Sequence, residues 1–154
     1  MNCELSHRVY LGLGANLGDR EETIRRAYRH IERLIGVIKR QSAFFYSEPW
    51  GFESGNSFVN SVICVETTLT PRQVLHRTKL IERRLGKTRQ HATERHPLVN
   101  GALPITHYSL YHDRPIDIDI LLYDNVHIDE PDLKIPHPLM HQRDFVMVPL
   151  NEII

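Results

Sequence analysis

This sequence has little cysteine, no excess of basic charge and no long apolar run. Its two cysteines, Cys3 and Cys64, form no Cys-x-x-Cys pair, which excludes a disulfide framework and argues against zinc or thioredoxin chemistry. Nineteen Lys and Arg balance nineteen Asp and Glu, so the global basic field typical of nucleic-acid-binding proteins is absent. No apolar run approaches the roughly 18 residues of a membrane span, and no signal-like core opens the chain. We therefore expect a cytoplasmic protein with no nucleic-acid or membrane partner.

What remains is an ordinary globular composition. The chain has 154 residues, of which 41% are hydrophobic and 25% are charged. A chain of this size can bury a core without a metal or disulfide. We expect a single domain over residues 1–154 that acts as a monomer.

The order of predicted elements indicates the fold class. Apolar spacing and turn residues predict strands over 9–14, 37–46, 58–67 and 116–123, helices over about 20–35 and 71–85, and a short apolar element over 145–150. Between the second helix and the strand at 116–123, residues 87–114 have no apolar period, and we expect a long mobile loop there. This order predicts an α+β, ferredoxin-like βαββαβ sandwich, an antiparallel sheet with the helices on one face.

The sharpest chemical feature is the run Asp117-Ile118-Asp119-Ile120. Alternate side chains of a strand share a face, so both carboxylates point one way, about 7 Å apart, and both isoleucines point into a core. Such a pair can hold one or two Mg²⁺ ions beside substrate phosphates. The alternative is a solvated face or a protected sheet edge.

Basic residues precede this strand. Residues 82–96 carry an excess of three positive charges, and Arg114 stands three residues before Asp117. Arginine and lysine bind phosphate oxygens, so this segment suits a polyphosphate, although a solvated helix end explains the charge better when the segment is taken alone.

Three weaker patterns complete the set. Gly12-x-Gly14-x-Asn16-x-Gly18 lacks the third glycine of a dinucleotide fingerprint, and we interpret it as a tight turn. Phe58, Asn60 and Phe145 could hold a flat heterocycle, although core packing also explains them. His137 stands between two prolines, six residues before Arg143, which could meet a phosphate.

Taken together, these segments resemble the 6-hydroxymethyl-7,8-dihydropterin pyrophosphokinase family of folate biosynthesis. The matching pieces are GLGANLGD from residue 12, YSEPWG from residue 46, FVN from residue 58, RPIDIDILLY from residue 114, PH at residue 136 and RDF at residue 143. The resemblance implies the ferredoxin-like fold, one catalytic domain, and transfer of diphosphate from ATP to the pterin hydroxyl with release of AMP and two Mg²⁺ ions as cofactor.

The resemblance also implies roles for individual residues. Asp117 and Asp119 would bind the two metal ions and, with Lys87 and Arg114, would be catalytic. The pterin would contact Glu48, Pro49, Gly51, Phe58, Asn60, Tyr111 and Phe145. The nucleotide would contact Glu82, Lys87, Arg89, Arg114, Ile120, His137 and Arg143. Two other classes stay open from the residues alone: a different metal-dependent phosphoryl transferase or phosphohydrolase, and a ligand-binding module without catalysis.

Overall fold

A computed structural model of the chain describes residues 5–47, 57–86 and 115–154. The elements run in the order β1 (His7–Ala15), α1 (Arg20–Leu34), β2 (Val37–Gln41), β3 (Phe45–Ser47), β4 (Phe58–Thr67), α2 (Pro71–Arg84), β5 (Asp117–Tyr123), β6 (Ile128–Glu130), β7 (Leu133–Ile135), η2 (Met140–Gln142) and α5 (Asp144–Ile153). The predicted βαββαβ order is present, with the second strand divided in two.

The main sheet is antiparallel throughout its described pairings. Its strands lie in the order β2-β4-β1-β5, and β3 also pairs with β4. The central strand β1 places Gly14 opposite Asn60 of β4 on one side and opposite Asp117 of β5 on the other. This register brings residues from three distant parts of the chain into one row across the sheet.

Side-chain caps begin both long helices. The Asp19 side chain accepts a hydrogen bond from the backbone N–H of Glu22, and Thr70 and Gln73 form a complete capping box at the start of α2. Both helices turn an apolar stripe toward the sheet, because Ile24 and Ile31 of α1 and Val74 and Ile81 of α2 are all fully buried.

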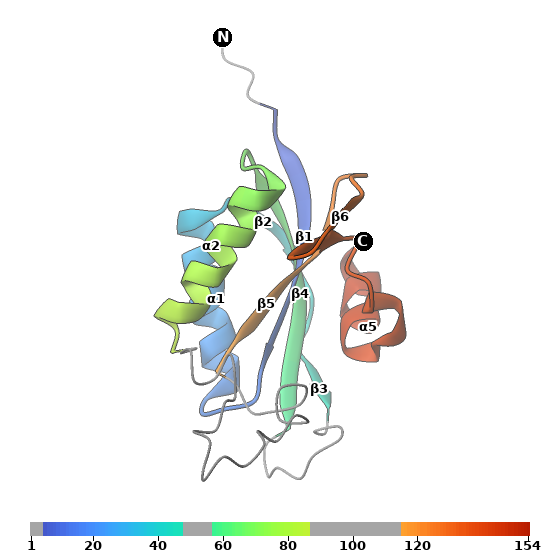
Figure 1. The fold of residues 1–154 in the computed structure, drawn as a ribbon. Helices are drawn as coiled ribbons and strands as arrows, with labels where there is room; N and C mark the ends of the chain where they lie inside the picture. The colour runs from blue at the N-terminus through green and yellow to red at the C-terminus, as the bar shows by residue number, and fades with distance from the viewer. Residues whose placement is uncertain (1–4, 48–56, 87–114) are drawn as a thin grey trace, which may run out of the picture.

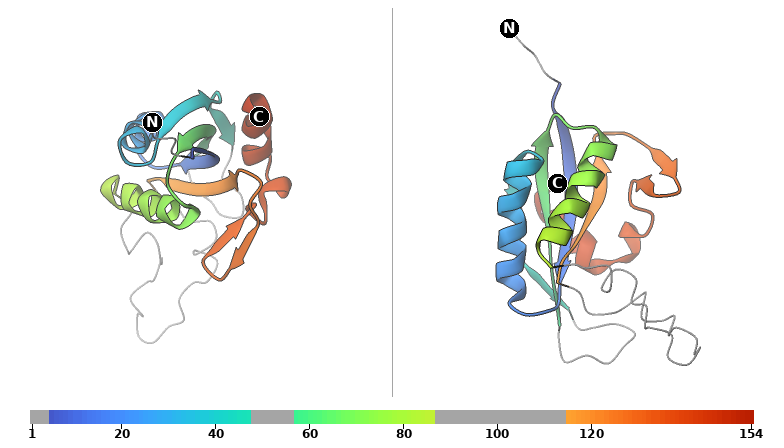
Figure 2. Two further views of the ribbon diagram at one scale, coloured as in Figure 1. Left: turned by 90° about the horizontal axis from the view of Figure 1, so that it is seen from above. Right: turned by 60° about the vertical axis from the view of Figure 1, so that its left-hand side comes forward.

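Helices cover both faces of the sheet (Figures 1 and 2). The larger core lies between the sheet and the pair α1 and α2, and contains Val9, Leu11, Leu13, Ile63 and Ile118. A smaller core on the opposite face contains Tyr10, Val62, Cys64, Val146 and Leu150, and α5 packs over it. The prediction of helices on one face therefore holds for α1 and α2, whereas α5 packs on part of the opposite face.

Two details refine the sequence prediction. The strand predicted over 37–46 is two strands, interrupted where the Ser42 N–H donates to the carbonyl of Val62. The segment after Asn125, which the strand prediction does not include, forms the hairpin β6–β7. Among the described residues no helix is long and apolar enough to cross a membrane.

Candidate active site

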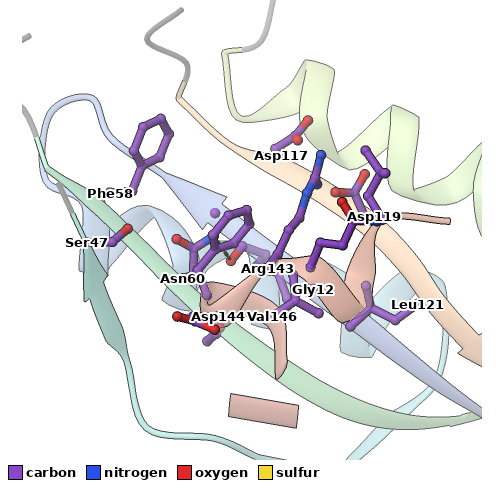
Figure 3. Close-up of a pocket in the computed structure, with 16 residues that line it drawn as sticks. Gly12, Ser47, Phe58, Asn60, Asp117, Asp119, Leu121, Arg143, Asp144 and Val146 are labelled. Atoms are coloured by element: carbon purple, nitrogen blue, oxygen red, sulfur yellow. Dashed lines mark hydrogen bonds between the residues drawn. The ribbon is translucent and has the colours of Figure 1, made fainter. Parts of the chain in front are cut away.

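A cavity of about 530 Å³ opens on the sheet face that carries α5. Its walls come from β1, β3, β4, β5 and the segment that leads into α5. Figure 3 shows Phe58 and Asn60 on one side and Asp117 and Asp119 on the other, with Arg143 reaching toward the aspartates. The sheet register therefore collects, in one hollow, the acidic and the aromatic residues that the sequence analysis singled out.

The strand alternation of β5 separates its acidic and apolar side chains as predicted. Asp117 and Asp119 line the cavity, whereas Ile118 and Ile120 are 2% and 6% exposed in the core beneath α1 and α2. The two isoleucines anchor the strand, and the two carboxylates are carried on its other face. Burial of apolar side chains thus provides the free energy that holds two like charges side by side.

Gly12 and Gly14 form the floor of the cavity. Both lie inside β1 and not in a tight turn, so that interpretation of the glycine pattern was wrong for these two positions. A Cβ atom on Gly14 would stand 2.5 Å from the amide nitrogen of Asn60, so the glycine makes room for that side chain. The turn itself is at Gly18, whose φ of +62° is in the left-handed region.

Asn60 and Phe58 point into the cavity from β4. The Asn60 side-chain amide donates to the backbone carbonyl of Leu13 at 3.3 Å, which directs its NH₂ group to β1 and leaves its carbonyl oxygen at the other end of the amide. Ser47 of β3 pairs with Phe58 and also lines the cavity. A polar edge beside an aromatic ring is a suitable arrangement for a flat heterocycle.

Arg143 and Phe145 close the cavity at the start of α5. The guanidinium carbon of Arg143 lies 5.5 Å from the centroid of the Phe145 ring, within range of a cation–π contact. Arg143 is the N-terminal flanking residue of α5, and both side chains are half-buried. One cation and one aromatic ring therefore line the hollow at the start of α5.

The carboxylate of Asp119 lies in surroundings that favour its neutral form. Its pKa is raised from 3.8 to about 7, chiefly by burial and then by the charges of Asp117 and Glu82, while the charges of Arg143 and Lys79 oppose this shift. Among the described residues neither a hydrogen bond nor an ion pair reaches this carboxylate. A divalent cation would favour the ionised form, so the donor set fits such an ion.

The described residues offer this cation two carboxylates and no third ligand, since they contain no group of three or more His, Cys, Asp or Glu able to hold a metal. Mg²⁺ is commonly held by one or two carboxylates, with water and substrate phosphates completing its shell. Two carboxylates are therefore enough for an ion whose shell is completed by water and phosphate oxygens.

Glu82 supports β5 from the side of α2. It is 3% exposed, and its carboxylate accepts a hydrogen bond of 2.7 Å from the backbone N–H of Ile118, the residue between the two aspartates. Lys79 Nζ lies 3.9 Å from its other oxygen. Glu82 thus lies beside the acidic pair without lining the cavity, and its predicted contact with the nucleotide stays a prediction.

Two predicted nucleotide contacts are placed differently from the cavity-lining residues. The side chain of Ile120 is in the core on the opposite face of the sheet, so it does not line the cavity, and its predicted contact with the nucleotide stays a prediction. His137 donates its backbone N–H to the carbonyl of Leu121 at 3.0 Å. Burial and the charge of Arg143 lower the pKa of the His137 imidazole, and the charge of Asp117 opposes this shift. The ring is therefore within the electrostatic influence of site residues, although it does not line the cavity.

Seven predicted site residues lie outside the described residues and stay predictions: Glu48, Pro49, Gly51, Lys87, Arg89, Tyr111 and Arg114. The cavity also has lining residues that the sequence analysis did not assign, among them Gln142 and Asp144. The only sequence signal for them is their place beside Arg143 and Phe145. For the two floor glycines the signal was their spacing of two, which puts both on one face of a strand.

Fold and site together define a class: a ferredoxin-like α+β protein whose open sheet face carries paired carboxylates opposite aromatic side chains. A family model described as 7,8-dihydro-6-hydroxymethylpterin-pyrophosphokinase (HPPK) matches residues 10–154. The chain belongs to this family, and it is therefore an enzyme of the pyrophosphokinase class that acts in folate biosynthesis.

Two curated relatives agree with this assignment. A 2-amino-4-hydroxy-6-hydroxymethyldihydropteridine pyrophosphokinase of Porphyromonas gingivalis is 43% identical over 147 residues, which cover 94% of this chain and 89% of the relative. The enzyme of the same name from Aquifex aeolicus is 36% identical over 145 residues, 94% of this chain and 79% of that one.

Solved structures share the fold. A crystal structure of Plasmodium falciparum HPPK-DHPS with pteroate matches with a TM-score of 0.66 at 16% identity, over 98% of this chain and 39% of that chain. An HPPK-DHPS structure in complex with substrates has the same TM-score at 14% identity, over 96% of this chain. This chain thus spans about two fifths of those solved chains. The likeness confirms the ferredoxin-like α+β fold.

Proposed function

We propose that the chain transfers the diphosphate group of ATP to the hydroxyl of 6-hydroxymethyl-7,8-dihydropterin, with release of AMP and with two Mg²⁺ ions as cofactor. The observation that carries this proposal is the shared cavity: Asp117 and Asp119 face the same hollow as Phe58, Asn60 and Phe145. Membership of the pyrophosphokinase family supports the reaction class.

In this proposal the pterin occupies the side of the cavity formed by β4 and α5. Phe58 and Phe145 would stack on the faces of the ring, and the Asn60 carbonyl oxygen, whose amide group is held by Leu13, would accept a hydrogen bond from its edge. Ordered stacking and edge contacts would orient the hydroxymethyl group, which reduces the entropic part of the barrier.

The nucleotide phosphates would lie on the side of β5. Asp117 and Asp119 would hold Mg²⁺, which, when bound, neutralises phosphate charge and makes the substrate hydroxyl more acidic. Arg143, which already faces the aspartates, would bind phosphate oxygens, and the half-buried imidazole of His137 could donate to them. Lys87, Arg89 and Arg114 would add phosphate contacts.

The reaction balances as a substitution at the β-phosphorus of ATP. The oxygen of the pterin hydroxyl forms a bond to this phosphorus, the bond from it to the oxygen that bridges to the α-phosphorus breaks, and AMP leaves with that oxygen. The proton of the hydroxyl passes to solvent or transiently to Asp117 or Asp119. Cationic groups around the leaving oxygen would stabilise the charge that develops there.

Product analysis tests the proposal directly. Wild-type protein is incubated with ATP, Mg²⁺ and 6-hydroxymethyl-7,8-dihydropterin, and the products are followed by phosphorus NMR. We expect AMP and a pterin diphosphate in equal amounts. Formation of ADP with a pterin monophosphate, or of free phosphate without a pterin product, would overturn the proposal in favour of another phosphoryl transferase or a phosphohydrolase.

A further inference from the structure

The first turn of α1 contacts two strand ends that border the cavity. Arg20 Nη1 donates to the backbone carbonyl of Ser57 at 2.7 Å and to the Ser57 hydroxyl at 2.6 Å. The next residue, Glu21, accepts a hydrogen bond from the hydroxyl of Tyr46. Two consecutive helix residues therefore hold the end of β3 and the residue that leads into β4, which lie at the same end of the molecule as the first turn of α1 (Figures 1 and 2).

Each contacted residue is the direct neighbour of one that lines the cavity. Ser47 follows Tyr46, and Phe58 follows Ser57; both Ser47 and Phe58 line the cavity, and they pair with each other in the sheet. Adjacent side chains of an extended segment point in opposite directions. A residue held from the helix side thus fixes the backbone from which its neighbour enters the cavity.

The position of Arg20 is itself well defined. Gly18 turns the chain with a positive φ, Asp19 caps the helix through the Glu22 N–H, and the side chain of Thr23 donates to the Asp19 carbonyl at 2.9 Å. Asn16, which links β1 to this turn, is fully buried. The guanidinium therefore extends from a rigid junction between the central strand and the helix.

The Arg20 contact is also of a strong kind. A guanidinium that donates to two oxygens of one residue makes charge-assisted hydrogen bonds, which are about twice as strong as neutral ones. Arg20 is half-buried and reaches 37 positions along the chain to find these acceptors. Neither α1 nor the core requires an arginine here, because the apolar face of α1 is formed by other residues.

We propose that Arg20 is a positioning residue for the pterin side of the cavity: through Ser57 it holds Phe58 at the angle needed to stack on the ring. This inference rests on the proposed function, which makes Phe58 a pterin contact. Arg20 does not line the cavity, and it touches neither of the aspartates.

The effect of replacing Arg20 should therefore be confined to one substrate. Arg20→Met keeps the length of the side chain and removes both hydrogen bonds, and we expect the KM for the pterin to rise about tenfold, equivalent to about 1.4 kcal/mol. The KM for ATP should stay within about twofold of the wild type. Arg20→Lys keeps one donor group and the charge, so it should recover part of the pterin affinity.

Arg26→Met is the matched control. Arg26 is an exposed arginine of the same helix that makes no hydrogen bond or ion pair with any described residue. Steady-state kinetics of both variants, with urea unfolding of each, separate positioning from simple loss of stability. A pterin KM raised in Arg20→Met alone, with the ATP KM unchanged, supports the proposal. An unchanged pterin KM, or an equal rise in both KM values that follows the loss of stability, overturns it.

Amide hydrogen exchange tests the same contact without any substrate. Arg20→Met should speed the exchange of the Phe58 and Val59 amides at least tenfold and leave that of Val65, at the other end of β4, unchanged. Equal exchange in the two proteins overturns the positioning role whatever the activity. If wild-type protein binds no pterin, the proposed function fails, and the exchange result still decides whether Arg20 holds this strand end.

Discussion

Asp119 is a residue whose ionised form the fold disfavours. Burial, together with the nearby carboxylates of Asp117 and Glu82, raises its pKa to about 7. Natural active sites often hold such groups at a cost in stability. For this chain such a cost agrees with the proposed role of Asp119 in holding a cation.

The pH dependence of this cost has a definite sign. A carboxyl with a pKa raised from 3.8 to about 7 stabilises the fold below pH 4, and this contribution is lost as the pH rises through 7. With divalent cations removed by EDTA, Asp119→Asn should therefore raise the free energy of unfolding by about 1–3 kcal/mol at pH 8. At pH 5 the same substitution should raise it by much less. Urea denaturation at both pH values measures this difference.

Asp129→Asn is a control with the opposite sign. Lys134 lowers the pKa of this exposed carboxyl, so its ionised form contributes stability at neutral pH that falls away in acid. Its replacement should not stabilise the protein at pH 8. Equal effects of the Asp119 and Asp129 substitutions, or an Asp119→Asn protein that is less stable than wild type at pH 8, would contradict the assigned burial of Asp119.

Gly14 is the second residue on which the site depends. A Cβ at this position would stand 2.5 Å from the Asn60 amide nitrogen, whereas a Cβ on Gly12 would make contacts of 3.4 Å with Leu121. Gly14→Ala should therefore displace Asn60, cost about 1–3 kcal/mol of stability and weaken pterin binding. Gly12→Ala should cost less and act on pterin binding only weakly. Calorimetric titration of both variants with the pterin compares them.

Sequence patterns predicted some of these residues and not others, for physical reasons. The two aspartates were predictable because a strand has a period of two and the isoleucines between them define the buried face. Ile120 belongs to that buried set, and the same alternation excludes its side chain from the cavity. The space that Asn60 needs over Gly14 depends on the pairing of β1 with β4, which no local pattern contains.

At the scale of elements, helix α2 stabilises β5, the edge strand that carries Asp117 and Asp119. The Glu82 carboxylate accepts the Ile118 N–H on the side of β5 away from β1, so it supplies a partner for a buried backbone donor. Glu82→Ala leaves this donor without its acceptor and should cost about 1–3 kcal/mol in the free energy of unfolding.

Glu82→Gln keeps an oxygen that can accept the same hydrogen bond and removes only the charge. It should cost less stability than Glu82→Ala, and it should lower the pKa of Asp119, since one of the charges that raise it is gone. Thermal unfolding of both variants in EDTA compares them. Equal losses in the two variants would show that the hydrogen bond to Ile118 is not what α2 contributes.

The secondary-structure elements were more predictable than the surfaces and strands against which they pack. Caps at Asp19 and Thr70 and the apolar stripes behind them specify α1 and α2, because helix signals are local in the chain. The apolar character of residues 145–150 was evident, but its packing on the face opposite α1 and α2 was not, since an apolar stripe does not identify the surface it covers. The break between β2 and β3 likewise depends on Ser42 and its contact with Val62 of the neighbouring strand.

At the scale of the whole molecule, zero net charge conceals a local separation of sign. The aspartates of β5 face Arg143 across the cavity, and the sheet register brings these opposite charges together. Such a site needs both signs if it is to bind metal and phosphate at once. Composition alone could exclude a global basic field and could not locate this separation.

Ligand binding should therefore stabilise the whole fold only when metal and nucleotide are both present. A non-hydrolysable ATP analogue at 100 times its dissociation constant should add about 2.7 kcal/mol to the free energy of unfolding. For a chain of this length that corresponds to a rise in Tm of roughly 5–10 °C. Thermal scans with the analogue in Mg²⁺ or in EDTA test this; an equal rise in both would contradict a site built around a metal ion.

The most direct test of the account is the turnover of Asp117→Asn and Asp119→Asn at saturating ATP, pterin and Mg²⁺, beside Asp129→Asn as the exposed control. Loss of a metal-binding carboxylate should cost several kcal/mol of transition-state stabilisation, so we predict kcat values about 10²–10⁴ times lower for the two β5 variants and near wild type for the control. Near-normal turnover in either β5 variant would contradict the assignment of this pair to the metal.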